Sequence, residues 1–158
     1  MSDSLHHECG LGLIRLKHPL RYYLDKYGSP LYGLFKMYML MEKQLNRGQD
    51  GAGIAVLKLN TPKGSPYFHR SRCIEPTPPW QVLFKTIEQQ LNRLLQKDPD
   101  LLQNPEKLQL MFPYAGEIYM GHLRYGTHGE NSIDACHPVY RSNNWKTRSL
   151  VVAGNFNL

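Results

Sequence analysis

The chain has 158 residues, of which 41% are hydrophobic and 20% are charged, a composition typical of globular domains. It excludes a disordered, collagen-like or mucin-like chain, and the length is sufficient for one domain with a substantial core. The formal net charge is +6, but the basic residues are scattered and form no Lys/Arg block. We therefore expect a solvated basic surface rather than a nucleic-acid interface.

Three cysteines, Cys9, Cys73 and Cys136, are odd in number and lack the spacing of a metal site. The N-terminus has neither the basic leader nor the apolar stretch of a secretory signal. The richest apolar run, residues 31–41, contains Lys36 and is too short to span a bilayer. These features predict a cytoplasmic protein with no membrane role, no metal site and no cofactor in this domain.

Apolar periodicity predicts a strand, a helix and a second strand in the first third of the chain. Residues 9–16 form a glycine-containing apolar run typical of a buried strand, and a polar, aromatic loop is expected to follow as far as Pro30. Leu31, Leu34, Phe35, Tyr38, Met41 and Leu45 recur at helical spacing, which predicts a helix that ends at Gly48. Residues 54–59 then read as a second buried strand.

The rest of the chain again mixes the two kinds of element. After a turn at residues 60–66, the pattern predicts helices over residues 80–95 and 105–111 and strands over residues 116–125 and 149–153. Ile118, Met120, His122 and Arg124 are expected to share one face of their strand. This order favours a layered α+β fold with mostly antiparallel sheet over a doubly wound fold.

Four polar segments lie where the predicted strands meet loops, where side chains can converge above a rigid scaffold. They are residues 8–10, 46–53, 121–129 and 153–158. Each has an ordinary explanation when taken alone. Cys9 can be a core residue, the glycines of residues 46–53 can form a helix stop and a turn, and Arg124 can be an edge residue. In that last case its partner would be Glu117 or Glu130.

Taken in order, the four segments resemble the motifs of the class II glutamine amidotransferases, whose glutaminase domain is an N-terminal-nucleophile hydrolase. Cys9-Gly10 resembles the family's Cys-Gly start, and Arg47-Gly48 resembles its Arg-Gly pair. Residues 121–129 are similar to its Gly-His-x-Arg strand and loop, and Gly154-Asn155 stands at its His-Asn-Gly turn. The resemblance covers the chain from Cys9 onward, and residues 47–50 are most similar to the amidophosphoribosyltransferase subfamily.

The resemblance implies a layered α/β/β/α sandwich of mostly antiparallel sheets, incomplete at the C-terminus of this chain. It implies hydrolysis of L-glutamine to L-glutamate and ammonia, with Cys9 as nucleophile and with Asn155 and the backbone N–H of Phe156 as oxyanion donors. Phe156 stands where the family has glycine, so the backbone geometry at this position decides whether the second donor is kept. The expected substrate-binding residues are Arg47, Gly48, Arg124, Thr127 and His128.

The expected mechanism needs a free N-terminus at Cys9. A free cysteine thiol has a pKa of about 8.5, so a thioester mechanism near neutral pH requires a base. The base implied by the resemblance is the α-amino group of the cysteine itself, which exists only when residues 1–8 have been removed. We therefore expect a propeptide at residues 1–8 and the N-terminal part of a glutaminase domain at residues 9–158. The unprocessed, truncated chain is expected to be inactive.

Partners beyond L-glutamine follow only from the resemblance. It implies a C-terminal synthase domain, absent from this chain, that uses the ammonia, most simply a phosphoribosyltransferase domain of purine biosynthesis. It also allows a homo-oligomer of the full-length protein.

Two alternatives stay open. Another N-terminal-nucleophile hydrolase would use the same chemistry on a different amide, and a catalytically silent or regulatory domain of the same fold would only bind a ligand. Cys136-His137-Pro138 is expected to be a structural loop, because one adjacent Cys-His pair lacks the ligand spacing of zinc.

Overall fold

A four-stranded antiparallel sheet forms the centre of this computed structural model, which describes residues 8–74, 78–126 and 132–156. Its strands are β1 (Gly10–Arg15), β2 (Gly51–Leu57), β3 (Phe68–Cys73) and β4 (Ile118–Arg124), in the spatial order β1-β4-β2-β3. Gly10 pairs with Leu123 on one side of β4, and Gly51 pairs with Arg124 on the other. The last residues of β4 therefore lie between the first residues of β1 and β2.

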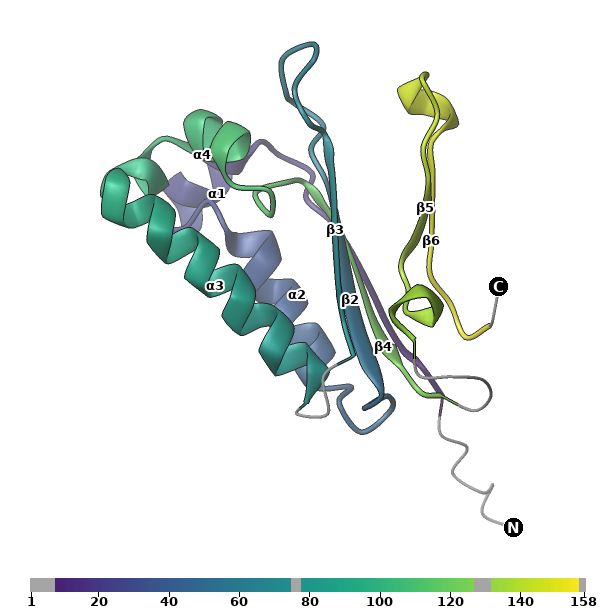
Figure 1. The fold of residues 1–158 in the computed structure, drawn as a ribbon. Helices are drawn as coiled ribbons and strands as arrows, with labels where there is room; N and C mark the ends of the chain where they lie inside the picture. Colours follow the sequence, from purple (N-terminus) through teal and green to yellow (C-terminus); the bar gives the residue numbers. More distant parts are fainter. Residues whose placement is uncertain (1–7, 75–77, 127–131, 157–158) are drawn as a thin grey trace.

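The helices cover one face of this sheet, and a two-stranded ribbon lies over the other face (Figure 1). The helices are α1 (Leu20–Tyr27), α2 (Tyr32–Glu42), α3 (Pro79–Lys97) and α4 (Pro105–Met111). The ribbon pairs β5 (Val139–Arg141) antiparallel with β6 (Leu150–Val152). Short 3-10 helices occupy Leu101–Gln103, Ile133–Ala135 and Lys146–Arg148. The predicted α+β class with antiparallel sheets is confirmed.

The main core lies between the helices and the sheet. Tyr119 and Leu123 of β4 are buried in this core, and Gly121 between them leaves room for α2. A Cβ at Gly121 would lie 2.7 Å from Sδ of Met37 and 2.9 Å from Cγ of Met41, so the glycine allows this close packing. Burying a methionine side chain such as that of Met37 or Met41 contributes roughly 1.5–3 kcal/mol to stability. The alternate residues His122 and Arg124 consequently face the ribbon.

One helix was not predicted. Residues 20–27, expected within a loop, form α1, which begins after Pro19 and ends at Gly28 with φ of 73°. Leu20 and Tyr23 of α1 are buried, and the Tyr23 ring stacks on Tyr32 of α2 at 5.3 Å between centroids. The loop prediction was wrong because the helix carries its apolar surface largely on tyrosines, which also occur in loops.

Other element boundaries also differ from the predictions. The second helix ends at Glu42, and turns at residues 43–47 replace its expected last turn. Phe35 is 59% exposed, whereas Met37 is fully buried, so the buried face of α2 is rotated from the predicted one. β1 is an edge strand with Leu13 exposed, and only one of its faces is buried. Strands β3 and β5 were not predicted.

Candidate active site

Cys9 lies directly before β1, at the end of the sheet where β4 finishes. Cys9 is a free cysteine and a partly exposed residue, and the backbone N–H of Tyr125 donates a hydrogen bond to its Sγ at 3.5 Å. Because Gly10 pairs with Leu123, continuing the register by one residue places Cys9 across from Arg124. The cysteine is therefore accessible and adjacent to the strand end that carries the arginine.

Asp50 supports the turn that follows β4. Its backbone N–H donates to the Arg124 carbonyl at 3.0 Å, and its carboxylate Oδ2 accepts from the Gly126 N–H at 2.8 Å. Arg124 is only 4% exposed, and a Cβ at Gly126 would lie 3.8 Å from its Cζ and Nη1. The guanidinium thus lies close to the backbone at Gly126, and Asp50 holds that backbone in place.

Arg124 is not an edge residue. β4 pairs on both sides, with β1 and with β2, and Glu117 precedes the opposite end of the strand. The Glu117 carboxylate instead accepts from the Leu59 N–H at 2.8 Å and from Gln109 Nε2 at 2.8 Å. The alternative of an edge arginine paired with Glu117 is wrong, because β4, which carries Arg124, is an interior strand and Glu117 has other partners. Glu130 lies outside the described residues.

Arg47 and Gly48 lie next to the start of β1 and the end of β4. Arg47 Nη2 is 3.3 Å from the Glu8 carboxylate, an ion pair between half-exposed side chains that contributes at most about 1 kcal/mol. A Cβ at Gly48 would lie 2.6 Å from the carbonyl carbon and oxygen of Leu123. Glycine therefore allows this segment to pack directly on the β4 backbone. The structure brings the first three motif segments together.

The fourth segment is connected to the same strand through a carbonyl group. Nε2 of His122 is 3.2 Å from the Gly154 oxygen, and Nδ1 of His137 is 3.0 Å from that same oxygen. Asn155 follows and is exposed. None of the described non-glycine residues has a positive φ, so the backbone at Phe156 has no conformational need for glycine. Thr127 and His128, two of the predicted substrate-binding residues, lie outside the described residues.

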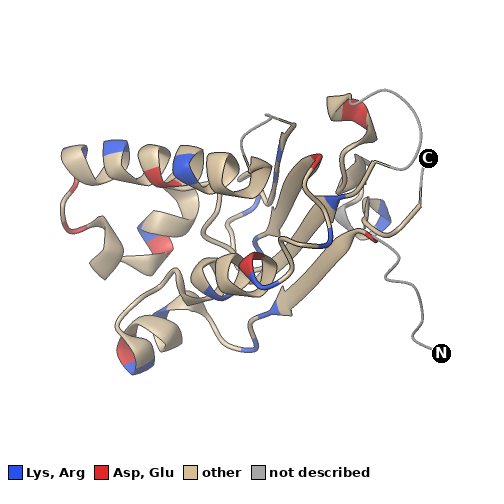
Figure 2. Ribbon diagram, turned by 90° about the horizontal axis from the view of Figure 1, so that it is seen from below, with Lys and Arg blue, Asp and Glu red and all other residues tan. Residues whose placement is uncertain are grey.

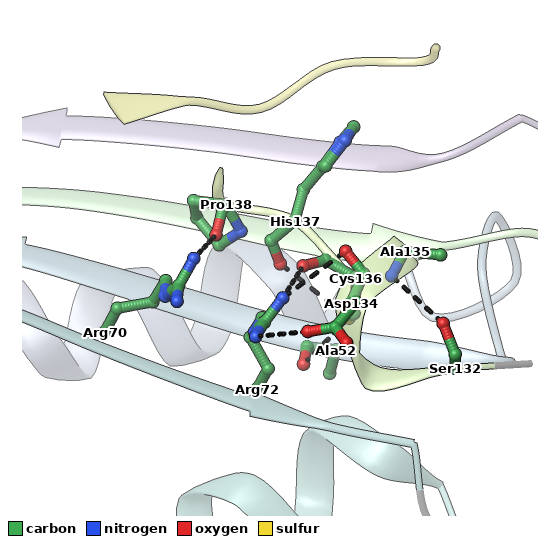
Figure 3. Close-up of polar contacts among 9 residues, drawn as sticks. All are labelled: Ala52, Arg70, Arg72, Ser132, Asp134, Ala135, Cys136, His137 and Pro138. Atoms are coloured by element: carbon green, nitrogen blue, oxygen red, sulfur yellow. Dashed lines mark hydrogen bonds and ion pairs between the residues drawn. The ribbon is translucent and has the colours of Figure 1, made fainter. Parts of the chain in front are cut away.

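Two arginines of β3, which the sequence did not single out, hold the segment before β5 on the sheet (Figure 3). Arg72 Nη1 donates to the Cys136 carbonyl at 3.2 Å, and its Nη2 is 3.4 Å from Asp134 Oδ1. Arg70 Nη1 donates to the Pro138 carbonyl at 3.3 Å. In Figure 3 the His137 imidazole points away from both arginines. The alternation of Arg70 and Arg72 in the sequence was the available signal for a polar face between the two sheets.

Burial dominates the electrostatics between the sheets. It lowers the pKa of His122 to about 4, with a further lowering by His137 and Arg124 that the Gly154 carbonyl partly opposes. The pKa of His137 is also lowered, first by burial. Burial raises the pKa of the Cys136 thiol to about 11, against the opposing effect of Arg72 and Arg124. Both imidazoles and this thiol are therefore neutral near pH 7.

Cys136 has a structural contact rather than the surroundings of a second nucleophile. It is fully buried, and its thiol donates to the Ala52 carbonyl at 3.4 Å. Within residues 8–74, 78–126 and 132–156, no three or more His, Cys, Asp and Glu side chains are grouped to hold a metal ion.

Lys and Arg are spread over helices, strands and loops and are interleaved with Asp and Glu (Figure 2). Some of them form exposed ion pairs, such as Arg21 with Glu106 at 2.8 Å. Across the described part of the chain, no helix has both the length and the apolar character to cross a membrane.

No protein-family model matches this sequence, and neither a curated protein nor a solved structure gives a match. A functional assignment therefore depends on the residues of the site, their geometry and the order of the motifs.

Proposed function

We propose that residues 9–158 are the N-terminal part of the glutaminase domain of a class II glutamine amidotransferase. The observation that carries this proposal is the position of Cys9, a partly exposed free cysteine that lies at the end of the sheet beside Arg124 and whose sulfur accepts the Tyr125 N–H at 3.5 Å. We assign the helices, the four-stranded sheet and the β5–β6 ribbon to the first three layers of an α/β/β/α N-terminal-nucleophile hydrolase fold.

Glutamine hydrolysis would proceed through a thioester on Cys9. The α-amino group of processed Cys9 takes the thiol proton, and the sulfur attacks the side-chain amide carbon of glutamine. The C–S bond forms and the C–N bond breaks, and the ammonium group returns the proton to the leaving ammonia. Water then hydrolyses the thioester to glutamate and regenerates the thiol.

Arg124 is the proposed ligand of the glutamine α-carboxylate. Its planar guanidinium can donate two parallel hydrogen bonds to a carboxylate, and its burial excludes water that would compete for them. Asp50 holds the backbone on both sides of Tyr125, so the arginine is attached to a rigid strand end. Arg47, Gly48, Thr127 and His128 complete the proposed substrate pocket.

The tetrahedral intermediate carries an oxyanion, and a single preorganised donor to such an oxyanion contributes roughly 3 kcal/mol in other enzymes. The side-chain NH2 of Asn155 and the backbone N–H of Phe156 are the proposed donors. The absence of a positive φ among the described non-glycine residues supports the second donor, because Phe156 can occupy the family's glycine position without backbone strain.

Removal of residues 1–8 would precede catalysis. The Cys9 thiol attacks the Glu8 carbonyl carbon, and the C–N bond breaks as the acyl group moves from nitrogen to sulfur, which frees the α-amine of Cys9. Water then hydrolyses the thioester, which releases residues 1–8 and regenerates the thiol. The ion pair between Glu8 and Arg47 supports this step, since it holds the residue before the scissile bond beside the site. The released ammonia is proposed to reach a synthase domain, with phosphoribosyl pyrophosphate as the ammonia acceptor that the resemblance implies.

Two measurements on one preparation test the proposal. A version of the protein is made whose leader is removed by an added protease so that Cys9 becomes the first residue, and glutamate release from L-glutamine is measured. The same preparation is treated with a glutamine-analogue diazoketone, and the modified peptide is identified by mass. We expect glutamate release and modification at Cys9, and loss of both in Cys9→Ala but not in Cys73→Ala. A free N-terminal Cys9 with neither activity nor modification would refute the proposal and favour a catalytically silent domain.

A further inference from the structure

Two buried histidines from different parts of the chain meet at one main-chain oxygen. His122 of β4 and His137 before β5 are 1% and 3% exposed, and their ring centroids are 4.8 Å apart. Nε2 of His122 and Nδ1 of His137 lie 3.2 Å and 3.0 Å from the Gly154 carbonyl oxygen. This arrangement connects the interior strand β4 to the turn that carries Asn155.

The chemistry of a carbonyl determines which nitrogens carry hydrogen. An oxygen of this kind only accepts, so both contacting nitrogens must be N–H donors, and a neutral imidazole has one such donor. His122 is therefore the Nε2–H tautomer, and His137 is the Nδ1–H tautomer. The opposite tautomer of His137 would instead accept a hydrogen bond from the Gly154 N–H at Nδ1, but that distance is 3.4 Å, and the shorter 3.0 Å contact with the oxygen favours the Nδ1–H form. The remaining nitrogen of His122, Nδ1, is buried without a partner among the described residues.

The backbone around His137 is held against the sheet, which makes its imidazole a rigid donor. A Cβ at Gly53 of β2 would overlap the His137 carbonyl oxygen, so only glycine allows this approach. Arg72 binds the carbonyl before His137, and Arg70 binds the carbonyl after it (Figure 3). His122 is held by the hydrogen-bonded strands on both sides of β4.

The two hydrogen bonds restrict the backbone at Gly154. Glycine has the greatest backbone freedom, and the orientation of its carbonyl determines the direction of the peptide that leads into Asn155. A Cβ at Gly154 would overlap the Phe156 ring, so a more restricted residue cannot replace the glycine without moving that ring. Two donors on one carbonyl remove much of this freedom without a side chain at Gly154.

We propose that His122 and His137 are positioning residues that hold the Gly154 carbonyl and thereby place Asn155 and the Phe156 N–H. The catalytic consequence rests on the proposed glutaminase function, in which these two groups meet the oxyanion. The paired tautomers and the ordering of Asn155 do not depend on that function.

A positioning role can be distinguished from a general effect on stability with amide side chains of two lengths. In one set of variants the amide nitrogen falls at the position of the histidine donor, and in the other set it does not. The amide nitrogen of glutamine replaces a histidine Nε2, and that of asparagine replaces Nδ1, so His122→Gln and His137→Asn keep the donor in place. His122→Asn and His137→Gln carry the same amide groups at the wrong length. We expect each of the two single variants with an amide of the wrong length, the mismatched variants, to lower kcat for glutamine hydrolysis by about 10- to 100-fold, with KM changed by less than about 3-fold. For the matched variants, His122→Gln and His137→Asn, kcat should stay within about 5-fold of that of the unchanged protein. Equal losses in matched and mismatched variants would overturn the proposal.

Nuclear magnetic resonance provides a readout that does not require activity. Imidazole nitrogen shifts should identify His122 as the Nε2–H tautomer and His137 as the Nδ1–H tautomer. The backbone order parameter of Asn155 should stay near about 0.85 in the matched variants and fall below about 0.6 in the mismatched ones. The opposite tautomers, or an Asn155 equally ordered in all variants, would refute the positioning role. An unchanged protein that shows these signals but hydrolyses no glutamine would support the positioning and refute only the proposed function.

Discussion

Acidification should destabilise this protein through His122. Burial is the largest cause that lowers the pKa of His122 from 6.5 to about 4, so the folded state keeps this imidazole neutral at pH values where the unfolded chain protonates it. Stability is then complete above about pH 6.5 and decreases as the pH falls toward about 4. From these two pKa values, the loss from His122 alone is about 2 kcal/mol at about pH 5 and about 3 kcal/mol near pH 4.

The measurement is urea unfolding at about pH 7.5 and about pH 5, on the unchanged protein and on His122→Gln. Glutamine keeps a donor at the Nε2 position but cannot titrate, so its stability should respond less to pH. Groups with shifted pKa values that do not interact with His122, such as His69 and Glu106, are present in both proteins and cancel in the comparison. We expect the variant to lose about 2 kcal/mol less than the unchanged protein between the two pH values. Equal losses, with unchanged denaturant slopes, would show that His122 is not buried as a neutral group.

Three further substitutions test the site and its support. Arg124→Lys keeps the charge but loses the planar fork, so KM for glutamine should rise about 10-fold or more in a steady-state assay, and an unchanged KM would remove Arg124 from the carboxylate site. Gly53→Ala places a methyl group on the His137 carbonyl and should cost about 1–3 kcal/mol in urea unfolding; full stability would contradict the close approach. Lys58→Met removes the donor to two buried carbonyls and the charge that interacts with Glu117, and should cost about 3 kcal/mol. A stability equal to that of the unchanged protein would show that the lysine charge is not needed there.

Regular apolar periodicity was sufficient to locate several elements. The prediction of a helix over residues 80–95 corresponds to α3, whose Trp80, Leu83 and Ile87 are buried at helical spacing. The short helix predicted over residues 105–111 is confirmed with the same bounds, and the Asn104 side chain accepts the Lys107 N–H at 3.0 Å at its start. The shared face of His122 and Arg124 is also confirmed, because β4 is a regular strand with a period of two.

Periodicity failed where polar or aromatic residues do the packing. α1 buries tyrosine instead of a run of aliphatic residues, and Arg70 and Arg72 of β3 contact the segment before β5. The helix predicted to end at Gly48 ends at Glu42. Its buried face is rotated because Gly12 and Gly121 of the sheet admit Met37, whereas Phe35 is exposed. The apolar periodicity of a helix does not specify the shape of the sheet surface on which the helix packs.

The sequence alone determined which residue types occur at strand ends and in which order, and hence the choice of Cys9, Arg47, Arg124 and Asn155 as candidates. Only the tertiary structure decided that β4 is interior and that His122 and His137 meet at Gly154, which lies 32 and 17 residues from them along the chain. Strand order and hydrogen-bond register arise from contacts between distant segments, so the local propensity of each segment does not predict them. The position of the Asn155 turn follows from those contacts.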